Sequence, residues 1–170
     1  GERLACQVLP EGDLCIENLS PAPRSQWKLL DVQNLQRSSE IPRKDLGPLP
    51  GDVPKPYGLA VDLGTTHLRL SLFDLLKGQR LTGRFGLNPQ SILGADALSR
   101  VQAASSSQHK AREFQDLALR AIGNALRDIA SRDGLDQKEV VRVLVVGNTA
   151  MLSLLSGRNH HLLLQQKSWR

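Results

Sequence analysis

Cysteine and aromatic residues are scarce in this sequence of 170 residues: cysteine occurs twice, and aromatic side chains make up 4% of the chain. Two cysteines close together indicate a reducing compartment rather than a disulfide framework, so we expect a cytoplasmic location. The few aromatic residues do not interleave with a basic patch, and the net charge of +5 is modest and scattered, which argues against nucleic-acid binding. Apolar runs long enough to span a bilayer are also lacking, which argues against a membrane protein.

Length and proline distribution divide the chain into three parts. A chain of this length can bury one core of ordinary size. Residues 1–18 are too few to fold alone, and residues 19–56 contain repeated prolines and polar residues, as a linker does. The one apolar patch of that linker, around Trp27, is expected to dock on a neighbouring part. Residues 57–170 are left to form the main domain.

The segment YGLAVDLGTTHLRLSLF, residues 57–73, organises that domain. An apolar run ends in an acid, the chain turns on a Gly-Thr-Thr sequence, and apolar residues then alternate at positions 68, 70 and 72. Alternation after a tight turn predicts a β-hairpin. We expect Gly64 to supply the positive φ that such a turn needs.

The same turn has the chemistry of a phosphate and Mg²⁺ site. Successive backbone N–H groups in a turn can form an anion-binding concavity, and the hydroxyls of Thr65 and Thr66 add adjustable donors. Asp62 can hold a hydrated Mg²⁺, which needs only one or two carboxylates. The turn resembles the first phosphate motif of the actin, hexokinase and Hsp70-type ATPases. An ordinary hairpin, whose acid and glycine serve only the turn, is the alternative.

Further elements follow from periodicity. Residues 80–87 are predicted to form a third antiparallel strand, and a helix is expected from about residue 94 to 104. Residues 111–131 carry a continuous i, i+3, i+4, i+7 apolar stripe, and Gly134 is placed to end this helix. Three charged residues outside the stripe are expected to be its solvated face, namely Arg120, Arg127 and Asp128.

Residues 140–146 form a continuous β-branched run, which predicts a central strand covered on both faces. A Gly-Asn-Thr sequence then leads into a helix that should end near Ser156. Asn148 and Thr149 therefore follow a strand where open α/β sheets bind ligands, although plain N-capping explains them equally well. The pair His160-His161 is expected at the surface.

The N-terminal segment RLACQ is similar to the tail of plant-type [2Fe–2S] ferredoxins. That resemblance implies that Cys6 is the last thiolate ligand of the cluster and that Cys15 packs in a closing strand. The other three ligands are absent from this sequence. One thiolate cannot hold a cluster, so the chain alone is expected not to contain one.

The whole set of motifs closely resembles one family: a ferredoxin-like tail, then AVDLGTT, NPQ, GADALSR and VVGNTAM in this order. It is the family of ATP-dependent reductive activators of corrinoid proteins, which combine a [2Fe–2S] domain with an actin/Hsp70-like ATPase domain. The resemblance implies an α/β fold, the first lobe of an actin/Hsp70-like (ribonuclease H-like) ATPase, in residues 57–170. It also implies that ATP drives an electron from the cluster onto a Co(II) corrinoid protein, giving Co(I).

On that resemblance the phosphate and Mg²⁺ site comprises Asp62, Gly64, Thr65 and Thr66, with Asn148 and Thr149 beside it. Asn88, Gln90 and Asp96 fall in family motifs without a role that the sequence explains. The expected partners are a corrinoid protein and an electron donor, and a homodimer is left open.

Relative to this family, we expect the sequence to be truncated at both ends, because the second lobe has no counterpart in it. We therefore expect the chain alone not to bind ATP tightly. Two alternatives stay open: a sugar or metabolite kinase of the same superfold, and an interaction module without catalysis.

Overall fold

The computed structural model describes Gly12, residues 27–30 and residues 47–165, and these residues form a mixed α/β structure. A five-stranded sheet has the order β1-β4-β3-β2-β5. Its strands are β1 (Lys28–Leu29), β2 (Tyr57–Leu63), β3 (His67–Asp74), β4 (Gln79–Leu87) and β5 (Val140–Gly147). Strands β2, β3 and β4 form the predicted antiparallel meander, and β5 pairs in parallel with β2.

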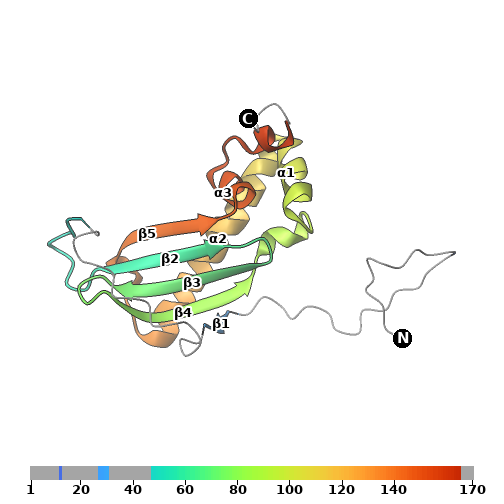
Figure 1. The fold of residues 1–170 in the computed structure, drawn as a ribbon. Helices are drawn as coiled ribbons and strands as arrows, with labels where there is room; N and C mark the ends of the chain where they lie inside the picture. The colour runs from blue at the N-terminus through green and yellow to red at the C-terminus, as the bar shows by residue number, and fades with distance from the viewer. Residues whose placement is uncertain (1–11, 13–26, 31–46, 166–170) are drawn as a thin grey trace.

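The helices gather on one side of the sheet and beyond one end of it (Figure 1). They are α1 (Ala97–Ser105), α2 (Gln108–Asp133) and α3 (Thr149–Ser156), with short 3₁₀ helices η3 (Pro89–Ile92), η4 (Gln137–Glu139) and η5 (His160–Leu164). The helix α2 runs behind the strands, and α1 and α3 lie past the ends of β2 and β5 (Figure 1). None of the helices among the described residues has the length and apolarity needed to cross a membrane.

The core lies between the sheet and α2. Alternate residues of β2 and β3 are buried against the helical stripe, including Leu59, Val61 and Leu70. Phe114 and Ile129 of α2 are completely buried in the same cluster. Each such large apolar side chain contributes about 1.5–3 kcal/mol on burial, so this interface is the main source of stability. The predicted stripe is confirmed, and α2 ends at Gly134, which has a φ of 67°.

An ion-pair cluster joins β4 to the last turns of α2. The guanidinium of Arg84 is only 2% exposed and contacts Asp128 at 2.5 Å and Asp133 at 3.1 Å. Burial lowers the pKa of Arg84, but the hydrogen bonds with the two carboxylates reverse this effect and leave the pKa raised. The expectation that Asp128 belongs to a solvated face was therefore wrong. A stripe analysis assigns Asp128 to the outside because the partner that covers it lies 44 residues away.

The expectation that β5 is a central strand covered on both faces was also wrong. β5 lies at an edge of the described sheet, and Val143, Leu144 and Val146 are 58%, 66% and 52% exposed. A continuous apolar run shows that both faces of a strand are apolar, but it does not show which elements cover them.

The apolar patch of the expected linker docks on the main domain. Lys28 and Leu29 pair with Phe85 and Arg84 at the other edge of the sheet. The ring of Trp27 lies where a side chain on Gly86 would be, since a Cβ there would come within 2.9 Å of it. Residues 19–26 and 31–46 of the expected linker lie outside the described residues, as does the predicted strand at 14–16.

Candidate functional site

The turn between β2 and β3 is the predicted hairpin, but its glycine acts differently from the prediction. The N–H of Gly64 donates to the carbonyl of His67 at 3.0 Å, which closes the turn. Gly64 is not among the glycines with a positive φ, so that expectation was wrong. Glycine is required here because a Cβ would lie 2.7 Å from the same carbonyl oxygen.

Three consecutive carbonyl groups of this turn accept hydrogen bonds from Asn88 and Arg100. Asn88 holds two of them: its Nδ2 donates to the oxygen of Gly64 at 2.8 Å, and its backbone N–H donates to that of Thr66 at 2.8 Å. The carbonyl of Thr65 accepts a 2.7 Å hydrogen bond from Nη1 of Arg100. Asn88 is fully buried and Arg100 is 1% exposed, so these contacts are shielded from water.

This binding orients the amide groups of the turn. A trans peptide unit is planar, so the N–H of a residue points away from the carbonyl of the residue before it. The carbonyls of Gly64 and Thr65 face Asn88 and Arg100, and the N–H groups of Thr65 and Thr66 must therefore point away from them. Within the part of the chain that the structure describes, neither N–H has an acceptor. The turn thus presents two free donors.

Asn88 is held in place by its own neighbour in the NPQ sequence. Its Oδ1 accepts from the N–H of Gln90 at 3.0 Å, and Gln90 in turn donates through Nε2 to the carbonyl of Phe114 at 2.8 Å. Gln90 is fully buried. The NPQ sequence therefore ties the turn to α2, which gives Asn88 and Gln90 the role that the sequence alone did not reveal.

Asn148 connects the second ligand-binding candidate to the first. Its Oδ1 accepts from the N–H of Met151 at 2.9 Å, as an N-cap of α3 does, and its Nδ2 donates to Oγ1 of Thr65 at 3.0 Å. The interpretation of Asn148 as an N-cap is confirmed, and its contact with Thr65 places it beside the turn, while ligand binding by Asn148 stays a prediction. Because Thr65 Oγ1 accepts in this pair, its own proton stays available to a further acceptor.

Asp62 and Thr149 lie at the margins of this arrangement. Asp62 is on the face of β2 opposite the core and pairs with Nη1 of Arg69 at 3.2 Å; the two side chains are about half exposed (47% and 51%). Exposed pairs of this kind contribute only about 0–1 kcal/mol, so the carboxylate can exchange partners. Thr149 is the exposed first residue of α3, and its side chain has no hydrogen bond in the described structure.

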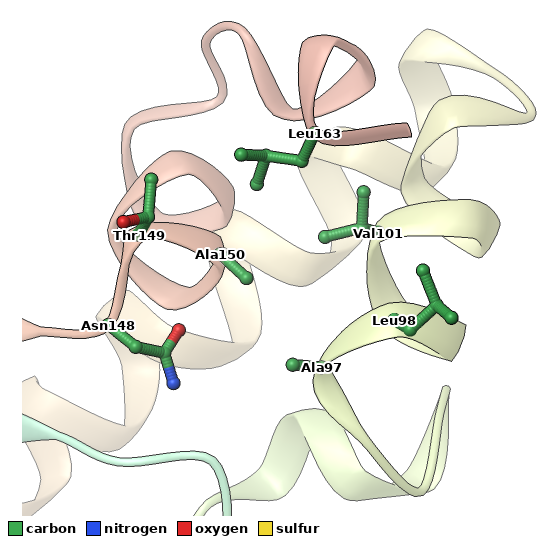
Figure 2. A pocket seen from close by; sticks show the side chains of 7 residues that line it. All are labelled: Ala97, Leu98, Val101, Asn148, Thr149, Ala150 and Leu163. Atoms are coloured by element: carbon green, nitrogen blue, oxygen red, sulfur yellow. The ribbon is translucent and has the colours of Figure 1, made fainter. Parts of the chain in front are cut away.

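A small apolar pocket of about 330 Å³ lies beside Asn148, between α1 and α3. Figure 2 shows its lining, to which both helices contribute, with the amide of Asn148 at one side and Leu163 at another. The other lining residues are Ala97, Leu98, Val101, Thr149 and Ala150. Such a pocket offers apolar contacts and little hydrogen bonding.

The structure also shows the surroundings of Asp96 and His160, two further residues that the sequence analysis singled out. The carboxylate of Asp96 accepts from the N–H of Ser99 at 2.8 Å in the capping box of α1, which explains its place in the GADALSR sequence. His160 is 9% exposed at the start of η5, so the expectation of a surface histidine pair was wrong for His160. The helix η5 contacts α1 and α3, and its Leu163 lines a pocket together with residues of both helices, which the doublet itself could not indicate.

Metal ligation is limited in the described part of the chain. It contains no group of three or more histidine, cysteine or acidic side chains that could hold a metal ion. Cys6 and Cys15 lie outside the described residues. A four-thiolate cluster does not fit this sequence, because it has two cysteines in total.

Comparison with known proteins identifies the family. The family described as "RACo middle region" matches residues 57–167, which is most of the chain. The chain belongs to this family. The matched range begins at the first residue of β2 and includes the turn, the NPQ sequence, Arg100 and Asn148.

Two relatives carry names that describe what they do. The "Corrinoid activation enzyme RamQ" of Eubacterium limosum is 26% identical over 98 residues, which is 58% of this chain and 16% of that protein. A solved structure named "Reductive activator for corrinoid, iron-sulfur protein" superimposes with a TM-score of 0.65 at 26% identity. The superposition covers 67% of this chain and 18% of the chain in the solved structure. This chain therefore spans less than a fifth of each.

Proposed function

We propose that residues 57–170 are the phosphate-binding part of the first lobe of an actin/Hsp70-like ATPase domain. The protein would use ATP to drive the reductive activation of a Co(II) corrinoid protein to Co(I). Family membership and the names of the two relatives support this proposal. One electron from a donor reduces the cobalt in this reaction, so the protein needs two partners, a corrinoid protein and an electron donor.

The orientation of the turn carries the proposal. Buried Asn88 and Arg100 hold the carbonyls of Gly64 and Thr65, so the N–H groups of Thr65 and Thr66 face the other way without acceptors. Preorganised N–H donors of this kind bind anions without a cost for reorganisation at the moment of binding. An ordinary hairpin turn has no need of a buried cation and a buried amide that hold its carbonyls.

Asp62 is the residue that would hold Mg²⁺. A hydrated Mg²⁺ bound beside phosphates needs only one or two carboxylates, and the half-exposed carboxylate of Asp62 fits this need. The ion would neutralise negative charge on the phosphate oxygens. Thr65 and Thr66 would contribute hydroxyl donors, and Asn148 fixes the hydroxyl of Thr65 by donating to it. Thr149 would lie next to this group at the start of α3.

Cys6 is proposed as a ligand of a [2Fe–2S] cluster in the remainder of a ferredoxin-like domain, residues 1–18, with residues 19–56 as the connection. The support is the RLACQ sequence, together with the words "iron-sulfur protein" in the name of the solved relative. Two cysteines cannot supply four thiolates, so no step of the mechanism is assigned to a cluster held by this chain.

The test is the substitution Asp62→Asn in the full-length natural protein. The conversion of Co(II) to Co(I) is followed spectroscopically with a reductant present and ATP added or withheld. We expect the ATP-dependent rate to fall by at least about 100-fold, as on removal of one preorganised electrostatic group. Asp116→Asn, which alters an exposed pair on α2, is the matched control and should leave the rate unchanged.

Two outcomes contradict the proposal. If the wild-type protein shows no ATP-stimulated cobalt reduction with any corrinoid protein of its cell, the activator function is wrong. If Asp62→Asn reduces cobalt as fast as wild type does, the turn is not the Mg²⁺ and phosphate site. Phosphorylation of a sugar by the wild-type protein would favour the kinase alternative.

A further inference from the structure

Arg100 is a buried cation without a carboxylate partner in the described structure. Its side chain is 1% exposed, and its hydrogen bonds go to neutral groups. Nε donates to the carbonyl of Gly94 at 2.7 Å, and Nη1 donates to that of Thr65 at 2.7 Å and lies 3.6 Å from the sulfur of Met151. No ion pair to it exists among the described residues.

This situation differs from that of the other arginine that is buried among the described residues. Arg84 is 2% exposed and is neutralised by Asp128 and Asp133. For Arg100 the carboxylate that acts on it is Asp96, which caps α1 without contacting the guanidinium. Burying an unpaired charge is costly, and its persistence in a structure calls for a compensating interaction. Burial lowers the pKa of Arg100, but arginine stays protonated in neutral solution.

The outward side of the Gly64-Thr65-Thr66 turn is the place where a negative charge could compensate that of Arg100. Arg100 contacts the inner side of the turn through the carbonyl of Thr65, whose peptide unit ends in the outward N–H of Thr66. An anion on the outward donors would therefore be separated from the guanidinium by about one peptide unit. Because the guanidinium is shielded from water, although Thr66 is exposed, the attraction exceeds that between two fully solvated charges at this distance. The positive charge also polarises that peptide unit, which strengthens its N–H as a donor.

We propose that Arg100 is a positioning residue that supplies charge to the anion site of the Gly64-Thr65-Thr66 turn, and that its buried charge is balanced when an anion with the chemistry of a polyphosphate binds there. This inference rests on the proposed function, because it assigns the same turn to phosphate. Binding and the charge of Arg100 are then coupled, so that removing the net charge weakens the binding of the anion without any change in the donors themselves.

Met151 provides a way to change this charge without removing Arg100. Met151 is completely buried next to Nη1 of Arg100. Met151→Glu would give the guanidinium the carboxylate that it lacks, and Met151→Gln is the matched control with similar shape and no charge. The probe is pyrophosphate without a divalent cation, titrated into the ¹⁵N-labelled 170-residue chain. The amide shifts of Thr65 and Thr66 report the affinity.

We expect pyrophosphate to shift the amides of Thr65 and Thr66 in wild type and in Met151→Gln with similar affinity. In Met151→Glu the affinity should be at least about fivefold lower, although the thermal midpoint stays near that of Met151→Gln because the new pair is hydrogen-bonded. A role of Arg100 in structure alone would not separate the glutamate from the glutamine variant.

A second pair of variants keeps the inference testable if Met151→Glu does not fold. Arg100→Lys retains the charge with fewer donors, and Arg100→Gln retains a donor without the charge; the lysine variant should bind pyrophosphate more tightly. Equal affinities within each pair would overturn the inference and leave the phosphate site intact. If pyrophosphate does not shift Thr65 and Thr66 in wild type, the phosphate site itself is wrong, and the role of Arg100 is wrong with it.

Discussion

Asn88→Ala is the most direct test of how the turn is held. Asn88 is fully buried, and its side chain pairs with two backbone groups, the carbonyl of Gly64 at 2.8 Å and the N–H of Gln90 at 3.0 Å. Alanine removes the partner of both groups, and water cannot replace it without opening the site. The turn and the start of η3 would each retain one unpaired polar group.

The expected cost follows from these two groups. Leaving a buried donor or acceptor without a partner costs about 1–3 kcal/mol, so two groups cost about 2–6 kcal/mol. A domain of this size has about 5–15 kcal/mol of stability, so the variant should fold but with a much reduced margin. The matched control is Asn124→Ala on the exposed side of α2, where alanine is the better helix former and a change within about 0.5 kcal/mol is expected.

Urea denaturation measures the free energy of unfolding, and hydrogen exchange at the amide of Gly64 measures the turn itself. That amide donates to the carbonyl of His67 at 3.0 Å, so its protection reports whether the turn is closed. We expect lower stability together with a greater loss of protection at Gly64 than in α2. A cost below about 1 kcal/mol would refute the reasoning on unpaired groups. Unchanged protection at Gly64 would show that Asn88 supports η3 rather than the turn.

Three other substitutions test separate contacts. Gly64→Ala should destabilise because its Cβ would lie 2.7 Å from a carbonyl, whereas Gly123→Ala, with open space in α2, should stabilise by about 0.5–1 kcal/mol; thermal denaturation compares the signs. Asp128→Ala should cost about 3 kcal/mol by uncovering Arg84, and Asp116→Ala, in an exposed pair, less than about 0.5 kcal/mol in the same urea assay. The hydrogen bond from the N–H of Ser99 lowers the pKa of Asp96, so the contribution of this cap to stability is present above the ordinary pKa of a carboxyl group and is lost as the pH falls. In Asp96→Asn the thermal midpoint should therefore fall less than that of wild type when the pH is lowered from about 5.

The elements that could be predicted are those whose signals are local. The hairpin, the meander and α2 follow from periods of two and 3.6 residues. Helix ends at Gly134 and Gly157 follow from the positive φ that both adopt. Asn148 was predictable as a cap because this signal is also local: Asn148 and the residue whose N–H it accepts from are three residues apart.

What could not be predicted depends on partners distant in sequence. Asn88 meets Gly64 across 24 residues, and Arg100 meets Thr65 across 35, so neither contact leaves a local pattern. One signal for Arg100 was present: it falls next to Val101 on the buried stripe of α1, where a cation is out of place. The partial burial of Asp128 was hidden for the same reason, since Arg84 lies in a different element.

The positions of these partners explain why separate short sequences accompany one turn. NPQ holds the carbonyls of Gly64 and Thr66, the arginine of GADALSR holds that of Thr65, and the asparagine of VVGNTAM holds the hydroxyl of Thr65. Each contact fixes a different atom of the same three residues, so none can substitute for another. A turn held only by its own strands could rotate a peptide unit at little cost, and a rotated unit would present a carbonyl to the anion. Buried donors behind the turn raise the cost of that rotation, because each would lose its acceptor. The fold thereby keeps the outer side of the turn a surface of donors.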